Sequence, residues 1–352
     1  MKKTNVMRVV CASVFFVVFT TVVSNLQAQA LTVCGHAITY DGDKIPYCRK
    51  AGRELGSVHK GITRAVIVLH GLNGNAHDYF TAVQGEAEAV NVDGHTTVIA
   101  PQFLNKAQRN TAGLAEEYVY WDNADWKIGN RSEDGSRNSS FEWIDTIVTR
   151  LIDNNPDLEH IAIVGFSAGG QAVHRYAGTA KVYWWAILSK DVTISYGVFS
   201  PSSYMWLVPY RPATTNNCPN FNKYKYGLDN IQSNRYMKDM QTKTIEGNYV
   251  WRRIYYAVGQ NDTSTDYPFD NSCEAKAQGA TRLERAKNYD LWAGLACIQA
   301  GLDNGISWEE SGNLCGSWYT DRTPLQIVPN VAHDHEKMFQ STQGRNILFF
   351  WE

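Results

Sequence analysis

The fold is decided by the stretch Ile161-Ala-Ile-Val-Gly-Phe-Ser-Ala-Gly-Gly170, in which an apolar run meets a glycine-rich turn. The apolar run predicts a buried strand, and the segment that follows, Gln171 to Ala177, predicts a helix. Between them, the pattern G-x-S-x-G places the Ser167 hydroxyl on a sharp strand-to-helix turn. Gly165 and Gly169 lack the Cβ atoms that would crowd this turn. The helix directs its free N–H groups toward the serine, where they can stabilise a developing negative charge.

The first 30 residues are typical of a secretory signal peptide. Basic residues at the N-terminus precede an apolar run from Val9 to Val23, and Ala28-Gln29-Ala30 has the form of a cleavage site. The apolar run is shorter than a membrane span, so a cleaved leader is favoured over a membrane anchor. We therefore expect residues 31–352 to form one catalytic domain, secreted or periplasmic and without a membrane anchor.

The charge of the chain disfavours nucleic acid and anionic membrane surfaces as partners. Lys and Arg number 33 against 35 Asp and Glu, and the formal net charge is −2. Loss of Lys2, Lys3 and Arg8 with the leader would change this charge from −2 to −5 and leave no basic block. No metal or organic cofactor is implied, because no segment has the spacing of a zinc site or an EF-hand.

Of the seven cysteines, Cys11 lies in the leader. Six cysteines on an exported chain predict up to three disulfides, with about fifteen possible pairings. The favoured local pair is Cys34–Cys48, which would close an N-terminal segment of short strands and turns from Leu31 to Gly61. The others are Cys218, Cys273, Cys297 and Cys315.

Strands and helices are expected to alternate along the chain, which predicts an α/β fold with a mostly parallel central sheet flanked by helices. Apolar runs predict strands at 65–71, 96–101, 161–164, 194–199, 253–259 and 325–329. Helical spacing is expected at 76–90, 141–152, 171–177, 273–299 and the C-terminus.

Two further segments are expected near the serine. Tyr118 to Ser140 contains Trp121 and Trp126 and predicts a long ordered loop; alternatively, it is a surface loop whose tryptophans only pack. The polar segment over about residues 205–250 lacks a strand or a long helical period, and it stands where such folds insert a cap.

A serine nucleophile needs a base within hydrogen-bond reach and a carboxylate that orients this base. On successive strands these groups should occur in the chain order Ser, Asp, His. Asp262 directly follows the strand at 253–259, and His333 follows the last strand, so Ser167, Asp262 and His333 form the candidate triad.

Alternatives remain for the acid and the base. Asp266 and Asp270 share a loop with Asp262, which is favoured because it lies closest to the strand end. His335 competes with His333, and proximity to the strand again favours His333.

The expected oxyanion hole consists of two backbone N–H groups. The first comes from Ala168, directly after the nucleophile, and the second comes from Leu72 in the loop after the strand at 65–71. His70, at the end of this strand, is expected to pack and to shape the backbone path without transferring a proton.

Several motifs, some of them outside this triad, resemble those of secreted bacterial α/β-hydrolases of the lipase/esterase kind, some of which are exported by plant-associated bacteria and act on cell-wall or lipid esters. The resemblance implies the α/β-hydrolase fold, a triad of Ser167, Asp262 and His333, oxyanion donors at Leu72 and Ala168, and a disulfide at Cys273. The motifs are His70-Gly71, Trp121/Trp126/Gly129, Gly165-Phe-Ser167-Ala-Gly169, Pro201-Ser-Ser203-Tyr204, Tyr226-Gly-Leu228, Cys273-Glu-Ala-x-Ala-Gln-Gly-x-x-Arg282 and His333-Asp-His335-x-x-Met338-Phe339.

The sequence therefore predicts hydrolysis of carboxylic esters, small or polymer-linked, through an acyl-enzyme intermediate on Ser167. Two other functions remain open. A serine peptidase or amidase would use the same triad, and a secreted carbohydrate-binding protein could have kept the scaffold without the activity.

Overall fold

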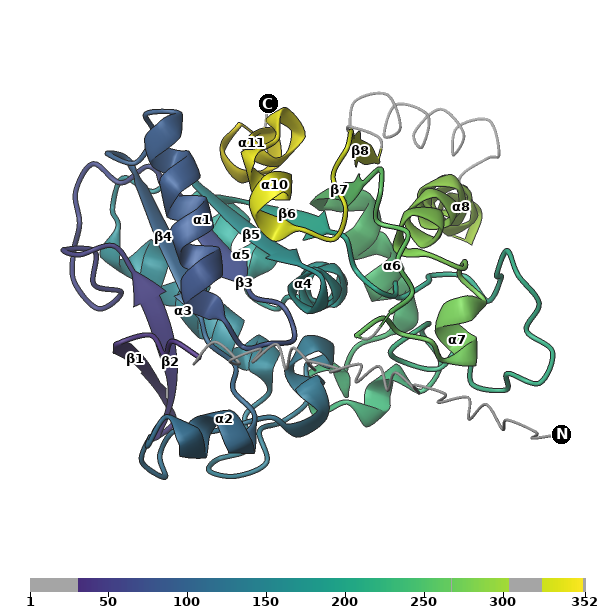
Figure 1. Cartoon of the computed structure of the whole chain (residues 1–352), viewed down its shortest axis with the longest axis horizontal. Coiled ribbons are helices and arrows are strands. Elements are labelled where there is room, and N and C mark those ends of the chain that lie inside the picture. Colours follow the sequence, from purple (N-terminus) through teal and green to yellow (C-terminus); the bar gives the residue numbers. More distant parts are fainter. Residues whose placement is uncertain (1–30, 267, 304–324, 351–352) are drawn as a thin grey trace, which may run out of the picture. The chain divides into compact units, whose positions relative to one another are not determined.

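One sheet of eight strands, in the order β1-β2-β4-β3-β5-β6-β7-β8, runs through the computed structural model (Figure 1). The structure describes residues 31–266, 268–303 and 325–350. Neighbouring strands from β4 to β8 pair in parallel, whereas β1 and β2 add an antiparallel hairpin at one edge. The strands are β1 His36–Tyr40, β2 Asp43–Arg49, β3 Arg64–Leu69, β4 Thr96–Pro101, β5 His160–Phe166, β6 Thr193–Phe199, β7 Arg253–Gly259 and β8 Gln326–Val328.

Helices cover both faces of the sheet, and this is why its central strands are apolar throughout. On β5, Ile161 and Ile163 face the cluster that contains α3 and α4, whereas Ala162 and Val164 face the cluster that contains α1 and α11. The helices are α1 Ala76–Ala89, α2 Lys106–Thr111, α3 Ser140–Asn154, α4 Ala168–Thr179, α5 Tyr183–Lys190, α6 Thr242–Trp251, α7 Cys273–Lys276, α8 Arg282–Asp303, α10 His335–Gln340 and α11 Thr342–Phe349, with short 3-10 turns η1 Asp122–Ile128, η2 Ile231–Ser233 and η3 Arg235–Met237.

The predicted helix 273–299 is wrong as one element, because the chain forms α7 and then α8. The backbone of Gly279 between them has φ 146°, which no helix contains. Its carbonyl accepts a hydrogen bond from Nε of Arg285 at 2.9 Å, so a side chain of α8 stabilises the break.

The N-terminal segment forms the expected short strands and turns. Asp41 and Gly42 both have positive φ, as a tight hairpin turn between β1 and β2 requires. The predicted disulfide Cys34–Cys48 is present and ties the start of the described chain to β2. A second disulfide joins Cys273 to Cys218, whereas Cys315 and the Cys297 side chain lie outside the description.

The segment 205–250 contains mostly turns, but it also contains α6, which its polar composition concealed. The expected leader, residues 1–30, lies outside the described residues. Among the helices that the structure describes, none has the length and apolarity needed to cross a membrane.

Candidate active site

Ser167 occupies the turn between β5 and α4. Its φ of 58° and ψ of −114° lie where non-glycine residues are rarely found. The Ser167 N–H donates to the carbonyl of Phe199 on β6 at 2.9 Å, which fixes the turn to the neighbouring strand. A Cβ atom at Gly169 would lie 2.1 Å from the carbonyl oxygen of Leu69, and one at Gly165 would lie 2.4 Å from the Gly169 backbone. Both glycines are therefore required by close backbone packing.

The structure brings Ser167, His333 and Asp262 into one hydrogen-bonded row. Oγ of Ser167 lies 2.9 Å from Nε2 of His333, and Nδ1 of His333 lies 2.8 Å from Oδ2 of Asp262. The Asp262 side chain is fully buried, whereas that of His333 is 24% exposed and open to a ligand. With Nδ1 donating to the carboxylate, Nε2 can accept the serine proton.

The ends of β7 and β8 hold the acid and the base side by side. Asp262 follows β7, and its N–H donates to the carbonyl of Gly259 at 3.1 Å. His333 follows β8, which pairs with β7. The two loops are so close that a Cβ atom at Gly259 would lie 2.3 Å from the carbonyl oxygen of Val331.

The alternative acids lie in different surroundings. Asp266 is exposed and accepts a hydrogen bond from the Ser264 hydroxyl at 2.9 Å. Asp270 accepts hydrogen bonds from the Tyr226 hydroxyl at 3.0 Å and from the Ser272 N–H at 3.2 Å. Asp270 is therefore part of a partly buried hydrogen-bond network.

Two other histidines near the serine are held by packing. His335 stacks on Tyr79 with ring centroids 4.2 Å apart, and burial lowers the pKa of His335. His70 is fully buried, with Nδ1 at 2.6 Å from the Gly71 carbonyl, and its Nε2 accepts the Phe103 N–H at 2.9 Å. Burial lowers the pKa of His70 to about 4, so this ring stays neutral and fixes the backbone path, as expected.

The two expected oxyanion donors belong to backbone segments that meet at the serine. Ala168 begins α4, so its N–H has no acceptor within the helix. Leu72 lies in the loop after β3, and its side chain packs on the core. Gly169 approaches the carbonyls of Leu69 and His70, so this loop runs directly beside the start of α4.

The Asp262 carboxylate has a second charged partner, Arg282, at the start of α8. Nη1 of Arg282 lies 3.5 Å from Oδ1 of Asp262, and both side chains are at most 3% exposed. Nε of Arg282 donates to the Ser202 hydroxyl at 3.2 Å, and the guanidinium lies 4.8 Å from the Phe269 ring. Arg282 thus balances the charge of Asp262 at the oxygen that His333 does not use.

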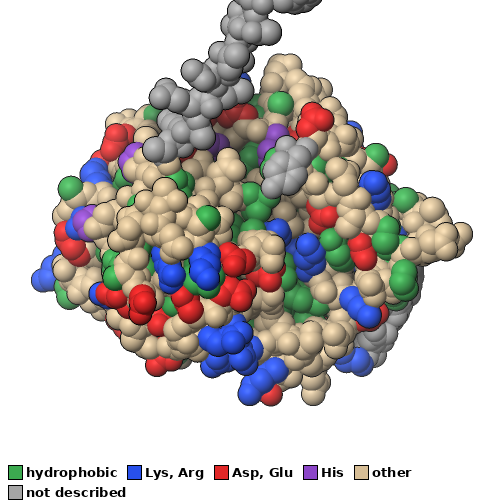
Figure 2. All heavy atoms as spheres, turned by 60° about the horizontal axis from the view of Figure 1, so that its bottom comes forward, with side chains coloured by type: hydrophobic (Ala, Val, Ile, Leu, Met, Phe, Trp, Pro, Cys, Tyr) green, Lys and Arg blue, Asp and Glu red, His purple; other side chains and the backbone are tan. Residues whose placement is uncertain are grey.

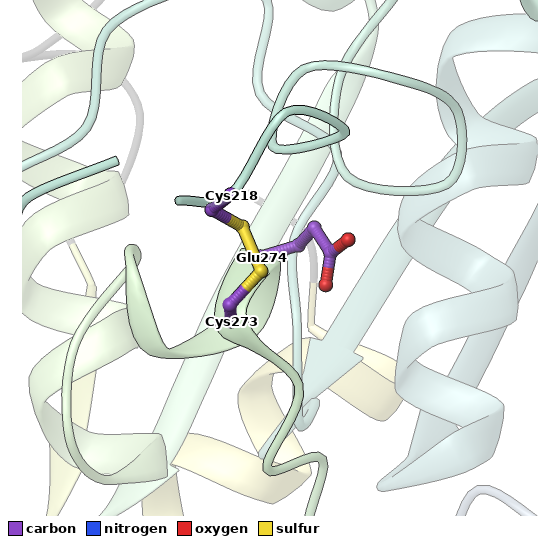
Figure 3. A group of neighbouring side chains, drawn as sticks. All are labelled: Cys218, Cys273 and Glu274. Carbon is purple, nitrogen blue, oxygen red and sulfur yellow. A yellow bond between two sulfur atoms is a disulfide. The ribbon is translucent and has the colours of Figure 1, made fainter. Parts of the chain in front are cut away.

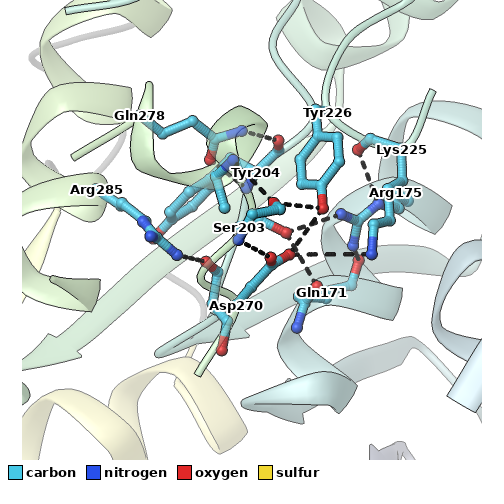
Figure 4. Close-up of polar contacts among 12 residues, drawn as sticks. Gln171, Arg175, Ser203, Tyr204, Lys225, Tyr226, Asp270, Gln278 and Arg285 are labelled. Carbon is cyan, nitrogen blue, oxygen red and sulfur yellow. Dashed lines mark hydrogen bonds and ion pairs between the residues drawn. The ribbon is translucent and has the colours of Figure 1, made fainter. Parts of the chain in front are cut away.

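Two more buried arginines surround the turn that follows β6 (Figure 4). Arg175 on α4 donates to the Ser203 hydroxyl at 3.3 Å, and Arg285 on α8 donates to the Ser202 carbonyl. None of these three arginines was predicted as part of the site. The spacing of Arg282 and Arg285 on the expected 273–299 helix is that of an ordinary polar face, and Arg175 lies in the expected helix at 171–177. The only signal was the position of Arg282 within one of the family-like motifs.

The tryptophan-rich loop contains η1, and its tryptophans do pack. Trp121 and Trp126 are at most 2% exposed, and both contact Phe103. The Trp126 ring also lies 4.8 Å from His70. The tryptophans therefore pack, as one of the two alternatives predicted. Through His70 the loop also supports the segment that leads from β3 to Leu72, as the other alternative, an ordered loop near the serine, predicted.

One group of potential metal ligands is found in the described part of the chain, namely Cys218, Cys273 and Glu274 (Figure 3). The two sulfur atoms are bonded to each other in a disulfide. Neither sulfur is therefore a thiolate, which is the form that binds metals.

No family model and no curated protein matches this sequence. Among solved structures, poly(aspartic acid) hydrolase-1 from Sphingomonas sp. KT-1 matches with a TM-score of 0.58 at 18% identity, over 92% of this chain and 100% of that one. LpqC, a poly(3-hydroxybutyrate) depolymerase from Bordetella parapertussis, matches with a TM-score of 0.56 at 18% identity, over 88% of this chain and 84% of that one. At this identity the likeness concerns the fold alone. Together with the sheet order and the turn at Ser167, it shows that the chain has the α/β-hydrolase fold.

Proposed function

We propose that the chain is a serine hydrolase that cleaves carboxylic esters. The observation that carries the proposal is the row of contacts from Ser167 through His333 to Asp262, at 2.9 and 2.8 Å. These distances suit a hydroxyl that loses its proton to a base oriented by a carboxylate.

In this mechanism Oγ of Ser167 attacks the ester carbonyl carbon while Nε2 of His333 takes its proton. The carbonyl oxygen becomes an oxyanion that accepts hydrogen bonds from the N–H groups of Ala168 and Leu72. His333 then gives the proton to the leaving alcohol, and an acyl-enzyme remains. Water, activated by the same histidine, releases the acid and restores the serine. Asp262 holds the imidazole in the required tautomer.

Hydrolysis of p-nitrophenyl esters from acetate to palmitate tests this proposal. The wild type is expected to cleave at least one chain length, and Ser167→Ala is expected to lose the activity. A parallel series of matched p-nitroanilides separates esterase from amidase. Cleavage of anilides at rates equal to or above those of the esters would favour the peptidase or amidase function.

We further propose that the chain is exported. The disulfides Cys34–Cys48 and Cys218–Cys273 support this, because such bonds persist in oxidising compartments. N-terminal sequencing of protein from the periplasm or medium should find Leu31 first. A chain that retains Met1 would contradict the predicted cleavage.

A further inference from the structure

Apart from His333, the Asp262 carboxylate has one charged partner among the residues that the structure describes, and this partner is Arg282. Nη1 of Arg282 lies 3.5 Å from Oδ1 of Asp262, whereas Nδ1 of His333 lies 2.8 Å from Oδ2. Oδ1 is buried and accepts no hydrogen bond within the described chain. The charge of Arg282 is therefore what stabilises this oxygen.

The Arg282 guanidinium is held beside Asp262 by contacts other than the ion pair. Nε donates to the Ser202 hydroxyl at 3.2 Å, and Nη1 approaches the Ser264 carbonyl at 3.5 Å. The first turn of α8 is joined to the same loop, because the Leu283 N–H donates to the Asp262 carbonyl at 3.2 Å. The turn after β6, the loop after β7 and the start of α8 thus fix the cation in place.

Burial makes this ion pair stronger than one at the surface. The side chains of Arg282 and Asp262 are 3% and 0% exposed, and two charges outside water interact more strongly than two charges within it. Exposed charges are a weak substitute. On the face that Figure 2 presents, Lys and Arg side chains lie among Asp and Glu side chains, and water and salt screen such groups. The buried cation therefore dominates the electrostatic environment of Asp262.

Asp262 and His333 share a short hydrogen bond and take up protons as a unit. The form that accepts the serine proton has an ionised carboxylate and a neutral imidazole, so this pair carries one negative charge. Uptake of one proton makes the pair neutral, and the triad then lacks either its free base or its carboxylate. A cation beside the pair favours the negative form over the neutral one. Arg282 should therefore extend the active form to lower pH.

The other ionisable groups near the pair are Tyr204, Arg285, Asp334 and His335. Burial raises the pKa of Tyr204 well above its usual value and lowers the pKa of His335, so both are neutral at pH 7. Arg285 donates to two backbone carbonyls, and Asp334 has an ion pair with Lys337 at 3.1 Å. None of these contacts involves Arg282, so the four groups form a constant background when Arg282 is replaced.

We propose that Arg282 is a positioning residue of the triad, which holds the Asp262–His333 pair in the negatively charged form that accepts the serine proton and so lets the enzyme work at mildly acidic pH. This inference rests on the proposed ester hydrolysis at Ser167. Arg282 takes no part in the proton transfer and acts through Asp262.

The test measures kcat/KM for one p-nitrophenyl ester from pH 4 to pH 9, read at the isosbestic wavelength of p-nitrophenol. The acidic limb of this profile reports proton uptake by the free enzyme. In Arg282→Gln its midpoint should move up by about one pH unit, the order of magnitude for losing a charge about 8 Å from the imidazole at an effective dielectric constant of about 20. KM should change little, because Arg282 acts through Asp262.

Two variants are the controls for this shift. Arg282→Lys keeps the charge at the same position, so its midpoint should stay near that of wild type. Lys287→Gln removes an exposed charge from the same helix and should leave the profile unchanged. Equal midpoints in wild type and Arg282→Gln, or the same shift in Arg282→Gln and Arg282→Lys, overturn the inference.

Proton NMR separates this inference from the proposed function, since it needs no substrate. The proton on Nδ1 of His333 that is hydrogen-bonded to Asp262 gives a low-field signal, which changes when the pair takes up a proton. If wild type cleaves no ester but this signal titrates at higher pH in Arg282→Gln than in wild type and Arg282→Lys, the proposed function fails and the role of Arg282 stands. The same midpoint in all three proteins overturns that role.

Loss of one buried charge can also prevent folding. If Arg282→Gln does not fold, the double variant Asp262→Asn/Arg282→Gln decides, because it removes both charges together. Charge balance predicts that the double variant folds, as shown by a cooperative thermal transition. A double variant that also fails to fold would show that Arg282 is needed for packing and would overturn the inference.

Discussion

Asp145 should make the stability of this protein depend on pH in a defined way. It lies on α3, and its two carboxylate oxygens accept the hydroxyls of Tyr176 on α4 at 2.6 Å and Tyr236 on η3 at 2.8 Å. The residue is partly buried, and both carboxylate oxygens are hydrogen-bonded to tyrosine hydroxyls. Burial raises the pKa of Asp145 from 3.8 to about 6, although the tyrosine hydrogen bonds oppose this.

The direction of the effect follows from this raised pKa. The folded protein binds the Asp145 proton more tightly than the unfolded chain does, so the stabilisation is fully present below about pH 4. It is lost as the pH rises through about 6. Because one pKa unit corresponds to about 1.4 kcal/mol, the whole shift is worth up to about 3 kcal/mol.

Asp145→Asn removes this titration while keeping the size of the side chain. Urea unfolding at pH 4, 5, 6 and 7, followed by tryptophan fluorescence, gives the free energy of unfolding of both proteins. The free energy of wild type minus that of the variant should fall by about 2 to 3 kcal/mol between pH 4 and pH 7. Asp153→Asn, an exposed position on the same helix, controls for charge removal. A difference that stays constant, or that rises with pH, would refute the reasoning.

Three further changes test the site and its frame. Asp262→Asn should lower kcat by about 10³- to 10⁴-fold with little change in KM, because the His333 imidazole then adopts the wrong tautomer. A loss of kcat below tenfold in steady-state kinetics would argue against this role of Asp262. Gly169→Ala should lower the free energy of unfolding, measured by urea denaturation, by on the order of 3 kcal/mol, because the new methyl group would clash with the Leu69 carbonyl, a backbone group that cannot rotate away. An unchanged midpoint of urea unfolding would contradict this packing. Cys34→Ser/Cys48→Ser removes a disulfide that closes a short loop, with a sequence separation of 14. Its loss should lower the free energy of unfolding by about 3 kcal/mol and therefore the melting temperature. The same melting temperature in wild type and variant would show that the bond stabilises little.

Local sequence was sufficient for the parts of the fold with a strong pattern. The run before Gly165 is β5, and the glycines around Ser167 form the turn that they predicted. Parallel strands bring their carboxyl ends to one edge, so the positions of Asp262 and His333 after β7 and β8 were enough to bring them together.

Other features depend on contacts that no local pattern contains. Cys273 was expected in a disulfide, but its partner Cys218 lies 55 residues away and could not be chosen among the possible pairings. The break before α8 is stabilised by a hydrogen bond from Nε of Arg285 to the Gly279 carbonyl. Arg282 pairs with Asp262 only because the fold places the start of α8 beside the end of β7. This contact is not local in the sequence, so the position of Arg282 on a polar helix face did not indicate that its side chain is buried.

The central claim is that the Ser167 hydroxyl is the nucleophile, and active-site labelling tests it most directly. The purified protein is treated with a fluorophosphonate, its residual esterase activity is followed, and labelled peptides are mapped by mass spectrometry. The mechanism predicts one adduct per chain, on Ser167, with activity lost in proportion to labelling and no adduct in Ser167→Ala. Full activity after labelling, or an adduct on another serine that accounts for the loss, would contradict it.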